Sequence, residues 1–160
     1  MPWPLSRPGK EKQMYIETSR FGALSIEESR VLTFPDGLPG FEGCRRFTLV
    51  PHPVAAGEAA GPFEWLQSVE DGTLAFLAMD PRRVFAHYKP TLGASELQSI
   101  DLDCCESGRL LSLLTVPKGD PCGITANLLA PVVVNPETRQ AKQVILTSDE
   151  YGVRHRLLPN

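Results

Sequence analysis

The residue types that most often carry catalysis or bind metals are few in this chain and widely spaced. The three histidines and four cysteines are His52, His87, His155, Cys44, Cys104, Cys105 and Cys122. No Cys-x-x-Cys occurs, and an adjacent cysteine pair without a matching second pair suits a tetrahedral metal site poorly. The histidines lack the spacing of metal ligands, and no motif of a zinc protease, serine hydrolase, dinucleotide-binding fold or P-loop is present. We therefore expect reduced thiols, surface histidines, no metal, no cofactor and no catalytic residues.

Charged residues cluster at four places, none of which indicates catalysis. Glu27-Glu28 follows Ser25 and is better explained by local capping and a solvated turn than by an acid–base pair. Arg45-Arg46, Arg82-Arg83 and Arg154–Arg156 are short basic clusters with aromatic residues nearby. Acidic residues are interspersed among them, and 19 acidic against 16 basic residues give a net charge of −3. This balance favours solvated surface over direct binding of nucleic acid.

The most distinctive segment is the turn-forming stretch Phe34–Glu42, which reads Phe-Pro-Asp-Gly-Leu-Pro-Gly-Phe-Glu. Proline fixes φ near −65°, whereas glycine tolerates positive φ, so this loop is expected to be rigid. A rigid loop that presents Leu38, Phe41 and Glu42 would lose little conformational entropy when it binds a partner. The alternative is that Leu38 and Phe41 only cap the end of the hydrophobic core.

The elements that would position these residues are predicted to be mostly strands. Fifteen prolines and 13 glycines among 160 residues predict many short elements and turns. About ten short apolar or alternating runs are typical of an all-β sandwich or barrel. They are Met14–Thr18, Gly22–Ile26, Val31–Phe34, Arg46–Val50, Phe63–Val69, Leu74–Met79, Leu110–Val116, Gly123–Leu129, Val132–Val134 and Lys142–Thr147.

Local signals add a hairpin and two short helical segments. Val132–Thr138 and Gln143–Leu146 are predicted to form a hairpin whose turn is supplied by Asn135-Pro136. Asp80 before Pro81 predicts a capped helical turn through His87. Ser95–Gln98 has the spacing of a capping box and predicts a helix that ends near Leu102.

The chain is long enough for one domain, which we place at residues 14–160. Met1–Gln13 has too little apolar surface to fold and is predicted to be a disordered tail. It also lacks the continuous apolar stretch of a signal peptide, and no run of 18 apolar residues occurs in the chain. These features predict a cytoplasmic protein that does not cross a membrane.

Several strings, in this order, resemble the flagellar assembly factor FliW family over roughly Tyr15–Leu157. They are Phe34–Glu42, Phe63–Ser68, Leu74–Phe76, Asp80-Pro81, Asn127–Pro131, Asn135, Gln143–Leu146, Tyr151 and Arg154. The resemblance implies a compact all-β, barrel-like fold without catalysis. It also implies two protein partners: the RNA-binding regulator CsrA, whose repression of flagellin messenger RNA is relieved by sequestration, and flagellin itself.

The resemblance also gives candidate partner-binding residues, which are the polar or turn-borne positions of the matching strings. They are Leu38, Phe41, Glu42, Gln67, Asp80, Asn127, Asn135, Gln143, Tyr151 and Arg154. We expect about half of the polar ones to satisfy buried backbone groups instead. Two other interpretations stay open at this point: a small flavin-binding β-barrel enzyme, and an RNA-binding barrel.

Overall fold

The computed structural model describes residues 12–52 and 61–158. Most of the predicted tail Met1–Gln13 lies outside these ranges, as do residues 53–60 of the loop between Pro51 and Gly61. Gln13 is described, and it begins the first strand rather than ending a tail. Within the described residues, no helix has the length and apolar character that crossing a membrane requires.

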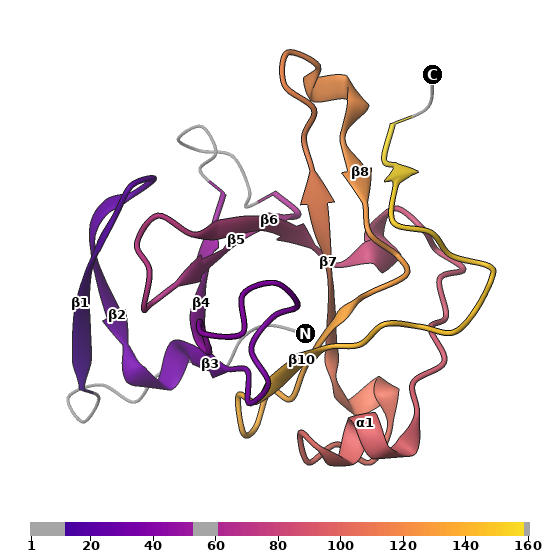
Figure 1. Cartoon of the computed structure of the whole chain (residues 1–160), viewed down its shortest axis with the longest axis horizontal. Coiled ribbons are helices and arrows are strands. Elements are labelled where there is room, and N and C mark those ends of the chain that lie inside the picture. Colours follow the sequence, from indigo (N-terminus) through magenta and orange to yellow (C-terminus); the bar gives the residue numbers. More distant parts are fainter. Residues whose placement is uncertain (1–11, 53–60, 159–160) are drawn as a thin grey trace.

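The fold is mostly β, as predicted, with eleven strands in the described ranges (Figure 1). They are β1 (Gln13–Thr18), β2 (Gly22–Glu27), β3 (Val31–Thr33), β4 (Arg46–Pro51), β5 (Phe63–Ser68), β6 (Ala75–Met79), β7 (Arg109–Thr115), β8 (Thr125–Ala126), β9 (Val132–Val134), β10 (Ala141–Gln143) and β11 (His155–Arg156). The main sheet has the order β10-β9-β7-β6-β5-β4-β3, with β8 paired to β7 and β11 paired to β8. The hairpin β1–β2 forms a separate sheet at one end of the molecule.

The main sheet curves around its own hydrophobic core. Every strand of the path contributes to this core, including Leu32 of β3, Phe47 of β4, Leu66 of β5 and Val132 of β9, all fully buried. Because side chains alternate along a strand, Leu77 and Met79 of β6 face away from this core. A second cluster of buried hydrophobic residues includes Leu97 and Leu110, and a third includes Tyr88 and Leu128.

The two edges of the main sheet meet at one point without closing it into a barrel. Thr33 of β3 forms a single parallel bridge with Gln140, and its N–H donates to the carbonyl of Arg139 at 2.9 Å. One bridge is not a ladder, so the arrangement is sandwich-like rather than a closed barrel.

The helical predictions are correct in place and partly wrong in detail. The carboxylate of Asp80 accepts from the backbone N–H of Arg82 at 2.9 Å, as predicted, but the 3-10 turn that it caps spans Pro81–Arg83 and does not extend to His87. Helix α1 spans only Ala94–Gln98, and its N-cap is Gly93 without a side-chain hydrogen bond. Ser95 therefore lies inside the helix, and the predicted capping box does not form. The helix stops early because Asp101 adopts a positive φ of 58°, which helices do not continue through.

The predicted hairpin near the C-terminus is confirmed as β9–β10, with Ala141 opposite Val134. Its second strand ends at Gln143, earlier than predicted, and the predicted strand Gly123–Leu129 shrinks to Thr125–Ala126. After β10 the backbone N–H groups of Val144 and Leu146 donate to the carbonyls of Pro131 and Leu129 outside a strand ladder. After β8 a side chain takes part. The carboxamide oxygen of Asn127 accepts from the N–H groups of Leu129 and Ala130, and the N–H of Leu129 is shared with the carbonyl of Gly152, so a turn replaces the strand here.

Candidate functional site

The segment Phe34–Cys44 forms a rigid corner, hereafter the corner loop, at the surface next to the main core. Two of its side chains point inward. Phe34 is fully buried, with its ring 5.3 Å from that of Phe47, and Leu38 is 1% exposed in the same core. Burial of two large apolar side chains fixes the loop to the sheet.

Backbone hydrogen bonds fold the corner loop into successive tight turns. Gly37 donates to the carbonyl of Phe34 at 2.9 Å, Phe41 to that of Leu38 at 2.7 Å, and Cys44 to that of Phe41 at 3.0 Å. The turns require glycine at two places, because Gly37 has φ +67° and Gly40 has φ +86°. The rigidity predicted from proline and glycine thus has a direct structural basis.

Phe41 and Glu42 occupy the outer side of the corner loop. The ring of Phe41 packs edge-on against Phe76 at 5.4 Å, yet 42% of Phe41 remains exposed. Glu42 follows it on the surface. An aromatic side chain held by its neighbours beside an exposed carboxylate is suited to binding a basic protein surface.

Two ionised groups hold the corner loop from outside. The carboxylate of Glu70 accepts from the N–H groups of Arg45 and Arg46 at 2.6 and 2.9 Å, where the loop enters β4. Chiefly because of the bond from Arg45, the pKa of Glu70 is lowered from its ordinary value. On the other side, the ammonium of Lys142 lies 3.5 Å from Asp36 and 2.8 Å from Glu96. Its pKa is raised, mainly by the hydrogen bond to Glu96.

Four of the predicted amide-bearing contact residues bind backbone groups of their own chain. Gln67 is fully buried, and its amide donates to the carbonyls of Ser68 at 2.9 Å and Leu74 at 3.1 Å. Its carboxamide oxygen has no hydrogen-bond partner among the described residues. Gln143 donates to the carbonyl of Ala130 at 3.0 Å.

The two asparagines close turns in different ways. The oxygen of Asn127 accepts two backbone N–H groups, as described above. Asn135 is 4% exposed, and its amide donates to the carbonyls of Ile100 and Asp101 at 2.9 and 3.1 Å. Its oxygen accepts from the N–H of Glu137 at 3.0 Å. Such bonds hold turns in place and leave little of these side chains for a partner.

The remaining three predicted residues differ in their surroundings. Asp80 caps its turn and pairs with Arg82 at 3.2 Å. The hydroxyl of Tyr151 accepts from the N–H of Lys89 at 3.0 Å, and its ring packs on Tyr88. Arg154 is exposed. The structure therefore brings Phe41 and Glu42 together at the surface, places Leu38 in the core, and scatters the others.

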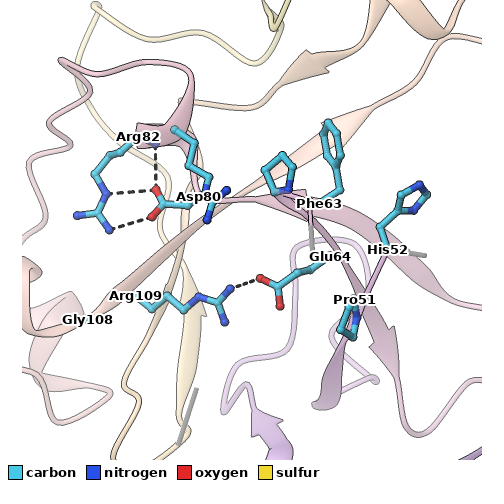
Figure 2. Close-up of a pocket in the computed structure, with 11 residues that line it drawn as sticks. Pro51, His52, Phe63, Glu64, Asp80, Arg82, Gly108 and Arg109 are labelled. Carbon is cyan, nitrogen blue, oxygen red and sulfur yellow. Dashed lines mark hydrogen bonds and ion pairs between the residues drawn. The ribbon is translucent and has the colours of Figure 1, made fainter. Parts of the chain in front are cut away.

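A polar pocket of about 320 Å³ lies between β5, β7 and the turn after β6 (Figure 2). Figure 2 shows Arg109 of β7 in an ion pair with Glu64 of β5, and the guanidinium of Arg82 held by both oxygens of Asp80. Each carboxylate of the pocket thus faces an arginine. Among the described residues, no group of three or more His, Cys, Asp or Glu side chains is arranged to hold a metal ion.

The cysteines are free thiols, as expected. Burial raises the pKa of the Cys105 thiol, which disfavours the reactive thiolate. His52 and His87 are exposed and His155 is half-buried, in keeping with the predicted surface histidines, and two of the three accept hydrogen bonds. Nδ1 of His52 accepts from the indole of Trp65 at 3.1 Å, and Nε2 of His155 accepts from the N–H of Gly152 at 2.7 Å.

Comparison with known proteins identifies the family. The FliW protein family model matches residues 14–157. The chain belongs to the FliW family. The flagellar assembly factor FliW of Natranaerobius thermophilus is 38% identical over 144 residues, which cover 90% of this chain and 92% of that protein. That of Bdellovibrio bacteriovorus is 39% identical over 141 residues, covering 88% and 77%.

The FliW fold is confirmed at the level of structure. A crystal structure of the flagellar assembly factor FliW superposes with a TM-score of 0.81 at 33% sequence identity. The match covers 92% of this chain and 99% of that one.

The sequence did not indicate the role of Glu70, which holds the corner loop. Its hydrogen bonds join it to residues 25 and 24 positions away, and no local pattern in the sequence marks such pairs.

Proposed function

We propose that this chain is a cytoplasmic, non-enzymatic antagonist of the translational regulator CsrA. By sequestering CsrA it relieves repression of flagellin messenger RNA. It also binds flagellin, so accumulating flagellin releases the regulator again. Two partners that compete for one small domain are linked reciprocally in free energy, which makes the pair a switch.

Membership of the FliW family over nearly all described residues supports this function, and the corner loop supports its location. Phe41 and Glu42 are the two predicted contact residues that lie side by side and exposed on a pre-formed loop. Because the loop is fixed by Phe34, Leu38 and Glu70, it loses little conformational entropy on binding. We therefore assign CsrA binding to this part of the surface.

Calorimetric titration of CsrA into the purified protein tests the proposal. Replacing Phe41 by Ala and Glu42 by Arg together should weaken CsrA binding by at least about tenfold, or 1.4 kcal/mol. The matched control is Ile145→Ala with Glu150→Arg, an exposed apolar and an exposed acidic residue elsewhere, which should bind as the original protein does. Full affinity in a folded corner variant would remove the site from the corner loop.

A second titration tests the switch. Flagellin monomer added to the preformed complex should release CsrA in proportion to the flagellin bound. A stable ternary complex of all three proteins would contradict mutually exclusive binding. Failure of CsrA to bind the original protein at micromolar concentrations would contradict the proposed function as a whole.

A further inference from the structure

We propose that an apolar groove on the outer face of β5 and β6, hereafter the outer groove, binds a peptide segment that carries apolar side chains and a carboxylate. This surface is separate from the corner loop, and the inference does not rest on the CsrA proposal. The groove has a volume of about 750 Å³, within the range of about 300–1,000 Å³ typical of ligand sites.

Strand alternation builds the floor of the outer groove. Leu66 and Ala78 face the main core, so their neighbours Trp65, Leu77 and Met79 face outward into the groove. The walls come from segments far apart in sequence. Arg20, in the β1–β2 turn, forms one wall, and Val116, Ile124 and Leu158 of the C-terminal half form the other.

Exposed apolar side chains gather along this groove. Of the seven large hydrophobic residues that are exposed in the described ranges, three line it: Val84 at 43%, Val116 at 47% and Leu158 at 47%. Single exposed hydrophobics are ordinary, but a cluster around a concave apolar floor marks a surface that another molecule covers.

The polar side chains that the described residues contribute to the groove offer hydrogen-bond donors, and none of them is a carboxylate. The guanidinium of Arg20 lies over the ring of Trp65, with its carbon 3.9 Å from the ring centroid. Stacking on the ring leaves the N–H edge of a guanidinium available for a carboxylate. None of the ion pairs among the described residues involves Arg20.

The indole of Trp65 also fixes the tautomer of His52. Because Nδ1 of His52 accepts the indole N–H, the proton of the neutral imidazole must sit on Nε2. Nε2 is then a second donor at the groove. Among the described residues that line the groove, Arg20 and His52 are the only titratable side chains. A ligand that complements them carries an acidic group set among apolar ones.

The outer groove and the corner loop lie on opposite faces of the same strand. Phe41 of the corner packs on Phe76, whereas the next residue, Leu77, lines the groove. A peptide in the groove therefore need not displace a protein bound at the corner. The two surfaces also present charges of opposite sign, since the corner loop presents the acidic Glu42 and the outer groove presents the basic Arg20.

The test is a selection of random dodecapeptides displayed on phage against the full chain, followed by fluorescence anisotropy of the enriched peptides. Enriched sequences should combine apolar residues with Asp or Glu. Their affinity should fall at least about tenfold for Arg20→Glu and for Val116→Asp, which alter opposite walls at exposed positions. Replacing the peptide's acidic residue by its amide should weaken binding similarly.

Two controls make the result specific. Ile145→Asp introduces the same charge at a 64% exposed apolar residue outside the groove and should bind the peptides normally. The corner variant with Phe41→Ala and Glu42→Arg should bind them normally too, so failure at the corner and failure at the groove are distinguishable. The proposal is overturned if no peptide is enriched, if acidic residues are not selected, or if both groove variants bind as well as the original. It is also overturned if sedimentation shows a dimer that Val116→Asp dissociates, since a second copy of the chain would then occupy the groove.

Discussion

Gly37 packs so closely on the backbone of Glu42 that a methyl group added to Gly37 would lie 2.6 Å from the Cα of Glu42. This contact sets the path of the chain between the buried Leu38 and the exposed Phe41. The same backbone approach that excludes any larger residue at position 37 fixes the backbone of Glu42, the residue after the exposed Phe41. The shape of the corner loop and its proposed binding residues are therefore coupled.

Gly37→Ala should lower the free energy of unfolding by about 2–4 kcal/mol, because it adds backbone strain at positive φ to a steric clash. Gly40→Ala is the matched control. Gly40 also has positive φ but no atom within 4 Å of an added Cβ, so it should lose only about 1 kcal/mol. Urea denaturation of both variants measures the difference. Equal losses would show that the contact with Glu42 carries no energy.

Leu38→Ala and Phe41→Ala should separate stability from binding. Leu38 is 1% exposed in the core, so its truncation should cost about 2–5 kcal/mol of unfolding free energy. Because Leu38 does not reach the surface, its truncation should weaken CsrA binding less than Phe41→Ala does, and only by loosening the loop. Phe41 is 42% exposed, so its truncation should cost less stability and weaken CsrA binding. Denaturation and calorimetry on both variants decide this. Normal CsrA affinity in Phe41→Ala, together with lost affinity in Leu38→Ala, would reverse the assignment.

Glu70→Gln should make stability less dependent on acid pH. The pKa of Glu70 is lowered in the folded state by bonds from Arg45 and Arg46, so its contribution is fully present above the ordinary value of 4.5. That contribution is lost as pH falls from 4.5 through the lower folded value. The original protein should thus be more stable than Glu70→Gln at pH 7, and the gap should narrow below pH 4.5. Glu150→Gln, at an exposed site, should show no such gap; a constant gap for Glu70→Gln would argue against an ionic contribution.

Asn135→Asp and Asn127→Asp form a matched pair that tests the two turns. Asn135 uses its amide as a donor to two carbonyl groups, so an aspartate there would place a carboxylate against them and cost about 2–4 kcal/mol at pH 7. Asn127 uses only its oxygen, which aspartate retains, so that variant should remain close to the original in stability. Thermal unfolding of the two variants compares them. Similar losses in both would mean that the donor bonds of Asn135 contribute little.

The sequence predicted the strands best where apolar runs are long and bounded by turn residues, as in β5 and β6. It predicted the ends of strands less well where a side chain competes for the hydrogen bonds of backbone N–H groups. Nothing in Gly123–Leu129 indicates that the side chain of Asn127 would close a turn by accepting from the N–H groups of Leu129 and Ala130. Likewise Ser95 has the residues of a capping box around it, yet the helix begins before it, at Ala94, with Gly93 as its N-cap. Burial of Leu97 and a turn at Asp101, rather than capping, decide the position of that helix.

By itself, the sequence determined an all-β domain, the stiffness of the corner loop and membership of the FliW family, because proline, glycine and strand alternation act over a few residues. Only the tertiary structure decided which candidates reach the surface. It buried Leu38, joined Glu70 to Arg45 across 25 residues, and assembled the outer groove from both ends of the chain. Such contacts depend on how distant strands pair and curve, and that information is spread over the whole chain rather than held in any one motif.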